Sequence, residues 1–141
     1  MAGDLRDLYC ADLPIVRAPK PKTRAQQILF LSGPYSKDPI ACTNAAIAVQ
    51  AELLKAGWSV FCPHANSHFA DVQHKLPPDF YYNMDLQFLR RCDAIVMLPG
   101  WISSKGATLE RDLALERGLP IYYWEFASDW KRLTGGGDGT R

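Results

Sequence analysis

The sequence predicts an α/β fold: a single domain with a Rossmann- or flavodoxin-like parallel sheet of four to five strands flanked by helices. Short apolar runs alternate along the chain with longer segments of helical periodicity. The apolar runs end at glycine, proline or serine, residues that commonly follow strands. Because strands that alternate with helices usually pair in parallel, with helices on both faces, this pattern favours the α/β class.

The first half of the chain predicts two strands and one helix. Residues 28–31 form a compact apolar run that ends at Ser32-Gly33-Pro34, which indicates a strand followed by a turn. Residues 40–56 are rich in alanine and carry larger apolar residues at helical spacing, and Gly57 is a natural helix end. Residues 58–62 then predict a second strand, which Pro63 closes.

The second half predicts a loop and four further elements. Asp79 is a plausible cap for the second helix, and Ser103 or Ser104 for the third. In order, we expect a loop over 64–78, a helix over 79–92, a strand over 93–98, a helix ending at Gly118, and a strand over 120–124.

The predicted domain covers residues 25–126. Residues 1–24 hold several prolines and basic residues and predict an N-terminal arm, in which Leu5, Leu8 and Tyr9 could form a short docking helix. Residues 127–141 predict a C-terminal tail, with a basic turn from Trp130 followed by three glycines.

Composition restricts the class of function. The chain has 141 residues, is 48% hydrophobic and 22% charged, and has a formal net charge of +1. That charge argues against duplex nucleic acid or an anionic membrane as partner, and no apolar run is long enough to span a bilayer. Because no signal sequence is recognisable either, we expect a cytoplasmic protein.

Neither the cysteines nor the histidines indicate a metal site, and we expect no cofactor. The four cysteines form no Cys-x-x-Cys pair, and Cys62 and Cys92 at the edges of apolar runs predict buried thiols. His64 and His68 have the spacing of a zinc pair only if they lie on a helix, whereas Pro63 and the residues after it predict a loop.

Glu110 is the first candidate for chemistry. It follows a strand and a predicted helix start at Ser103, Ser104 and Gly106, where unpaired N–H groups and the helix dipole attract anions. At helical spacing its neighbours are apolar, so its carboxylate is expected on the inward face, which is costly without a partner or a role. A structural role beside the helix dipole fits its position equally well.

Asp85 has the same pattern on the preceding helix, with aromatic residues on both sides at helical spacing. A hydrogen bond to a nearby loop would explain it as well as catalysis does. Two inward carboxylates suit glycosyl chemistry, in which one attacks the sugar carbon and the other handles the proton of the leaving group.

Binding residues are expected where the carboxyl ends of the strands meet, in the loops 32–38, 63–78 and 99–105. Tyr35 could stack on a base or sugar or donate a hydrogen bond, although a simple turn explains its segment equally well. His64 could line the pocket or cap its loop, and Trp101 could wall the site or pack on another subunit. The candidate catalytic residues are Glu110 and Asp85, and the candidate substrate-binding residues are Ser32, Gly33, Tyr35, His64, Tyr82, Trp101, Ser103, Ser104 and Gly106.

Four segments together resemble the nucleoside 2-deoxyribosyltransferase-like superfamily, and more narrowly a phage and prophage branch that is known mainly as a domain of unknown function. They lie between residues 28 and 122: Leu-Ser-Gly-Pro-Tyr-Ser, Tyr-Tyr-Asn-x-Asp, Cys-Asp-Ala-Ile-Val-Met-Leu-Pro-Gly-Trp, and Ser-Lys-Gly-Ala-x-x-Glu. The sequence differs from the pattern of this superfamily at two places. Phe30 aligns where characterised enzymes usually carry a tyrosine, and residues 34–37 replace a phosphate loop rich in glycine and arginine.

The resemblance implies cleavage or transfer of an N-glycosidic bond in a nucleoside or nucleotide, by a homodimer or homotetramer whose neighbouring subunits complete the site. It implies that Glu110 is the nucleophile, that Asp85 assists the base, and that Ser103, Ser104 and Gly106 hold a 5′-phosphate. Two alternatives stay open: a non-catalytic nucleotide-binding or sensing module, and a phosphoribohydrolase of the cytokinin-releasing type. The latter's Pro-Gly-Gly-x-Gly-Thr-x-x-Glu pattern begins similarly at Pro99 and then diverges.

Overall fold

The computed structural model describes residues 20–135, which form a four-stranded parallel sheet with helices on both faces. The strands are β1 (Ile28–Ser32), β2 (Ser59–Phe61), β3 (Ala94–Met97) and β4 (Ile121–Tyr123), in the order β2-β1-β3-β4. The predicted α/β class and parallel sheet are therefore confirmed. Since β1 lies between β2 and β3, the strand order reverses beside it, which is the point where such sheets bind ligands.

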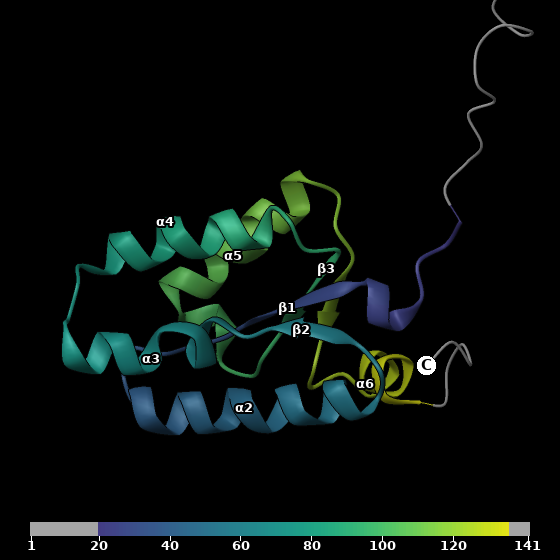
Figure 1. Ribbon diagram of the computed structural model, residues 1–141, viewed down its shortest axis with the longest axis horizontal. Helices are drawn as coiled ribbons and strands as arrows, with labels where there is room; N and C mark the ends of the chain where they lie inside the picture. The colour runs from purple at the N-terminus through teal and green to yellow at the C-terminus, as the bar shows by residue number, and fades with distance from the viewer. Residues whose placement is uncertain (1–19, 136–141) are drawn as a thin grey trace, which may run out of the picture.

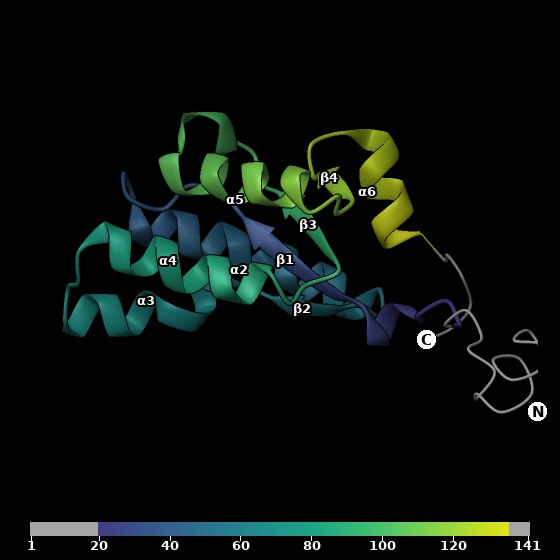
Figure 2. The same ribbon diagram turned by 90° about the horizontal axis from the view of Figure 1, so that it is seen from above.

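Helices α2 (Pro39–Lys55) and α6 (Ala127–Thr134) cover one face of the sheet, and α4 (Pro78–Leu89) and α5 (Lys105–Glu116) cover the other (Figures 1 and 2). Helix α3 (Pro63–Gln73) lies beside α2 near the β2 edge. Two short 3-10 helices, η1 (Arg24–Gln26) and η2 (Trp101–Ser103), precede β1 and α5.

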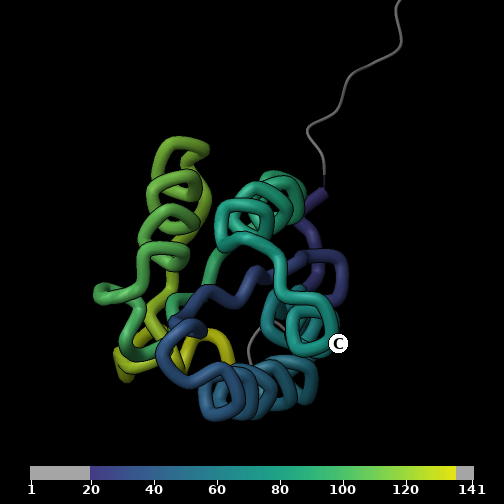
Figure 3. Tube along the Cα trace, turned by 90° about the vertical axis from the view of Figure 1, so that its left-hand side faces the viewer, coloured from purple at the N-terminus to yellow at the C-terminus, as the bar shows by residue number. Residues whose placement is uncertain are grey.

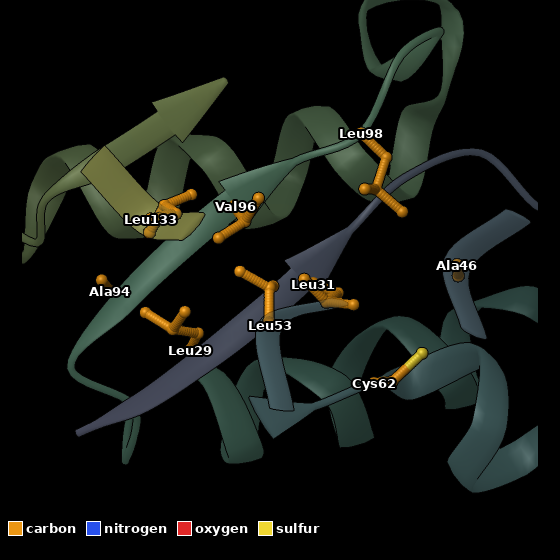
Figure 4. Packing of buried hydrophobic residues seen from close by; sticks show 9 residues of the cluster. All are labelled: Leu29, Leu31, Ala46, Leu53, Cys62, Ala94, Val96, Leu98 and Leu133. Carbon is orange, nitrogen blue, oxygen red and sulfur yellow. The ribbon is translucent and has the colours of Figure 1, made fainter. Parts of the chain in front are cut away.

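Side chains alternate along each strand, so the sheet supplies two separate cores. Leu29 and Leu31 face α2 and α6, whereas Phe30 and Ser32 point to the side of α4 and α5. Figure 4 shows the first core, which contains Leu29, Leu31, Ala46, Leu53, Cys62, Ala94, Val96, Leu98 and Leu133. Because β1 and β3 are covered on both faces, nearly all of their residues are buried, as is typical of parallel sheets.

The expected loop over 64–78 is wrong, because residues 63–73 form helix α3. Pro63 closes β2 as predicted, but it also occupies the first turn of the helix, where its fixed φ and missing N–H are tolerated. The helix buries His64 and His68, which are four residues apart and lie on one face. The helix was not predicted because Pro63 was interpreted only as the end of a strand and not also as the start of a helix.

The boundaries of the expected arm and tail are also corrected. Arg24 is buried: its guanidinium donates to the carbonyls of Ala56 and Arg132 and packs on Trp58. The expected tail instead forms α6 up to Thr134, with Leu133 fully buried in the first core. The proposed docking helix at Leu5, Leu8 and Tyr9 and the glycines at 136 and 137 lie outside the described residues.

The remaining predicted elements shift by one to three residues. Asp38 caps α2, Ser104 rather than Ser103 caps α5, and Pro77 rather than Asp79 precedes α4. Cys62 and Cys92 are buried as free thiols, as predicted. Among residues 20–135, no helix is both long and apolar enough to cross a membrane.

Candidate functional site

A cavity of about 430 Å³ lies at the carboxyl end of β1, beside the reversal of strand order. Its walls come from the β1–α2 loop, α3, the α3–α4 linker, α4 and the start of α5. Figure 3 views the molecule from the side on which these segments meet. The three loops expected to bind a ligand therefore all contribute to one site, although the second of them is largely helical.

Glu110 lies on α5 and lines the cavity. It is only 7% exposed, and Ser32 Oγ donates a hydrogen bond of 2.6 Å to Glu110 Oε1. Both positions follow from periodicity: Glu110 shares the inward stripe of α5 with Ala107 and Ala114, and Ser32 follows Phe30 on the strand face toward α5. The predicted inward orientation of Glu110 is confirmed.

Asp85 reaches the same cavity from α4 and is 9% exposed. Its Oδ1 atom is buried and has no hydrogen-bond partner among the described residues. A buried carboxyl oxygen without a partner is costly, so a purely structural role explains Asp85 poorly. The alternative of a hydrogen bond to a neighbouring loop finds no support at this atom.

Burial shifts the ionisation of both acids. Loss of solvation raises the pKa of Asp85 to about 7. Loss of solvation and the charge of Asp85 raise the pKa of Glu110 to about 8, while the hydrogen bond from Ser32 opposes this rise. Near neutral pH the two carboxyls therefore do not both carry a full charge, and one of them can hold a proton for transfer.

The start of α5 adds donors to the cavity wall. The side chain of Ser104 accepts from the N–H of Ala107, while the N–H groups of Lys105 and Gly106 precede the first helical bond. Gly106 also lets α4 approach closely, because a Cβ there would lie 2.9 Å from a ring carbon of Tyr82. Ser103 lines the cavity too, although its hydroxyl donates to Gly100 O.

Three exposed lysines, Lys37, Lys75 and Lys105, line the cavity from three different segments. The Lys105 ammonium lies 5.9 Å from the centre of the Tyr82 ring. No ion pair to Lys37 or Lys75 is found in the described part of the chain. The cavity thus combines acids at its buried end with cations near solvent.

Tyr35 and His64 also line the cavity. Tyr35 Oη lies 2.9 Å from both His68 Nδ1 and Asp71 Oδ2, and burial together with Asp71 raises the Tyr35 pKa to about 12. His64 Nε2 lies 2.9 Å from the carbonyl oxygen of Pro34, and burial lowers its pKa. Tyr35 therefore presents a neutral phenol whose hydroxyl already has protein partners.

Most of the predicted binding residues meet at this cavity, but two do not line it. Ser32 contacts the site only through Glu110. Trp101 packs instead on Tyr123 and under the guanidinium of Arg111, at 5.0 Å from its ring centre. The predicted residues that line the cavity are Gly33, Tyr35, His64, Tyr82, Asp85, Ser103, Ser104, Gly106 and Glu110.

The sequence-based prediction missed Asp71, Lys37 and Lys75 as cavity residues. For Asp71 a signal existed: it lies three residues after His68, so assigning a helix there would have placed it near the histidines. The helix gives His64 and His68 the spacing of a zinc pair, but His64 bonds to the Pro34 carbonyl and His68 to the Tyr35 hydroxyl. In the described residues no three His, Cys, Asp or Glu side chains are grouped to hold a metal ion.

A comparison with protein families matches residues 27–123 to one described as a domain of unknown function, DUF4406. The chain belongs to this family. The match runs from just before β1 to the end of β4 and includes every residue that lines the cavity. A search of curated proteins finds no match, so the DUF4406 assignment leaves the chemistry to be inferred from the cavity.

Proposed function

We propose that this DUF4406 protein cleaves the N-glycosidic bond of a nucleotide, or transfers its sugar to a second base, through a carboxylate nucleophile. The observation that carries the proposal is the pair Glu110 and Asp85, two buried carboxyls from different helices on one cavity. The resemblance to the nucleoside 2-deoxyribosyltransferase-like superfamily points to the same two residues.

In this reaction Glu110 attacks the anomeric carbon of the sugar and forms a glycosyl ester. The C–N bond breaks with its electron pair passing to the base, and the Asp85 carboxyl supplies the proton that the departing nitrogen takes up. Water, losing a proton to the Asp85 carboxylate, then attacks the sugar carbon and releases Glu110; a second base replaces water in transfer. Ser32 holds the attacking carboxylate through the 2.6 Å hydrogen bond.

The rim of the cavity favours a phosphorylated substrate over a free nucleoside. The resemblance assigns a 5′-phosphate to Ser103, Ser104 and Gly106, and a phosphate there would also meet Lys105. Residues 34–37 lack the arginines of the phosphate loop that they replace, but Lys37 within them and Lys75 from the α3–α4 linker add positive charge to the cavity. Charge complementarity therefore supports a substrate with a cationic transition state at one end and an anion at the other.

Release of free base from matched nucleosides and 5′-monophosphates tests the reaction. We expect the wild-type protein to release base, and the Glu110→Gln variant to be slower by on the order of a thousandfold or more. Glu116→Gln is the control, because Glu116 is an exposed acid on the same helix. Base release at the wild-type rate by Glu110→Gln would refute the assignment.

The lysines have a separate test on the same panel. A variant with Lys37→Met, Lys75→Met and Lys105→Met should lose most of the preference for 5′-monophosphates over nucleosides, while base release from nucleosides changes little. Added salt should weaken the wild-type preference in the same direction. If the wild-type protein cleaves both classes equally, the proposed reaction still stands, but the 5′-phosphate has no role in substrate recognition.

One observation favours a second candidate, a nucleotide-binding module without turnover. Burial raises the pKa of Glu110 to about 8, so its protonated form predominates at pH 7, and a neutral carboxyl donates a hydrogen bond rather than attacking carbon. Titration calorimetry separates the two functions: tight nucleotide binding with no base release between pH 6 and 9 identifies the binding module. Under either proposal, the family resemblance implies a homodimer or homotetramer, and the sequence predicts a cytoplasmic protein.

A further inference from the structure

Tyr35 is held by two side chains of α3, the helix that the sequence did not predict. Its hydroxyl oxygen lies 2.9 Å from Asp71 Oδ2 and 2.9 Å from His68 Nδ1. The Tyr35 ring meets the His68 ring edge-on, with centroids 5.8 Å apart, and the His64 ring in the same way at 5.9 Å. Three residues of one helix therefore surround a tyrosine of the β1–α2 loop.

The directions of these hydrogen bonds follow from counting protons. Tyr35 has a single hydroxyl proton, and the Asp71 carboxylate can only accept, so Tyr35 donates to Asp71. The Tyr35 oxygen must then accept from His68, which requires the proton of His68 on Nδ1. His64 has the opposite arrangement, because the Pro34 carbonyl can only accept and Nε2 must carry the proton.

We propose that Asp71 and His68 are positioning residues, which orient Tyr35 so that its ring forms a stacking wall for the planar base of the ligand. The role of the ligand rests on the proposed function, whereas the proton arrangement does not. Because the Tyr35 proton is committed to Asp71, Tyr35 contacts the ligand through its ring and not as a hydrogen-bond donor. The sequence alone had left both possibilities open.

The same contacts join two walls of the cavity. Tyr35 bonds to Asp71 and His68, and Pro34 bonds to His64, so the β1–α2 loop is tied to α3 at two successive residues. Loss of the Asp71 contact frees the Tyr35 ring to rotate, and ordering that ring again opposes ligand binding. Asp71 thus acts on the ligand through Tyr35, although its own carboxylate also lies on the cavity wall.

The first test reads the proton arrangement directly. Nitrogen NMR of histidine-labelled full-length protein at pH 8 distinguishes the two neutral tautomers, and variants His64→Gln and His68→Gln assign the signals. We expect the Nδ1–H form at His68 and the Nε2–H form at His64. In Tyr35→Phe or Asp71→Ala the His68 ring should lose its preference for Nδ1–H. A wild-type His68 in the Nε2–H form would overturn the proposal, whatever the protein binds.

The second test uses opposite expected signs. Calorimetry measures binding of 2′-deoxynucleoside 5′-monophosphates to the Glu110→Gln protein, which cannot consume them under the proposed function. Removing the negative charge of Asp71 should by electrostatics alone tighten binding of an anion. If Asp71 positions Tyr35, Asp71→Ala should instead weaken binding by about tenfold.

Two variants complete this comparison. Asp71→Asn keeps an acceptor for the Tyr35 proton and should stay within about threefold of the parent protein. Asp79→Ala is the charge control, because Asp79 is an exposed acid in the first turn of α4. Unchanged or tighter binding by Asp71→Ala overturns the positioning role while leaving base release, and so the proposed function, intact. Absence of nucleotide binding together with absence of base release overturns the proposed function and the stacking role, and the tautomer measurement still decides the proton arrangement.

Discussion

Replacing Glu110 by glutamine should make the protein more stable at high pH relative to wild type. Glutamine keeps the shape of the side chain and an oxygen that can accept from Ser32 Oγ, but it cannot ionise. In wild type, burial raises the pKa of Glu110 from 4.5 to about 8. The folded state therefore holds a proton that the unfolded state releases between these pH values, so wild-type stability falls as pH rises through this range.

The size of the effect follows from the shift. A change from 4.5 to about 8 corresponds to about 5 kcal/mol when each pKa unit is worth about 1.4 kcal/mol. Glu110 is only 7% exposed, so solvent screens the effect little, although structural relaxation reduces it. We expect the stability of Glu110→Gln minus that of wild type to grow by about 2 to 5 kcal/mol between pH 5 and pH 9.

Urea unfolding of both proteins at several pH values measures this difference. Any constant cost of the substitution cancels, because only its change with pH is used, and Asp85 is present in both proteins. Glu116→Gln, at an exposed position of the same helix, should show no comparable pH dependence. A difference that stays constant within about 1 kcal/mol, or that shrinks as pH rises, would refute the burial argument for Glu110.

Three further outcomes are expected from single substitutions. Ser32→Ala removes the donor that lowers the pKa of Glu110, so the pH at which base release becomes half-maximal should move upward; an unchanged profile would exclude Ser32 from this role. Gly106→Ala places a Cβ 2.9 Å from Tyr82 and should lower the free energy of unfolding by about 1 to 3 kcal/mol in urea titrations, whereas no loss would mean that α4 shifts freely. Arg24→Ala should lower the free energy of unfolding by about 2 to 4 kcal/mol in the same titrations, because two carbonyls lose a buried charged donor. No loss would mean that Arg24 does not stabilise the folded domain.

The strands could be predicted because a buried strand is recognisable from its own residues. β1 and β3 are covered on both faces, and a strand buried in this way is an uninterrupted apolar run that can be recognised without knowing its neighbours. The segment 63–73 has no such run: six of its eleven residues are polar, and its buried residues are Pro63, His64 and His68. Helix α6 was not predicted for a similar reason, because Leu133 is the one buried residue among Ala127–Thr134.

For the site, helical spacing was enough to place Glu110 and Asp85 on inward faces, because the direction of a side chain depends on its own helix. Spacing does not reveal what lies opposite such a side chain. The contact of Ser32 with Glu110 joins residues 78 positions apart, and Tyr35 meets His68 and Asp71 across the loop and helix α3.

The sequence by itself determined the α/β class, the parallel strands and the two inward carboxyls, since each depends on periodicity within one segment. Only the tertiary structure decided that both carboxyls line one cavity, that three lysines surround it, and that Trp101 lies elsewhere. Their environment was decided there as well, because the raised pKa values of Asp85 and Glu110 come from burial by segments distant in sequence.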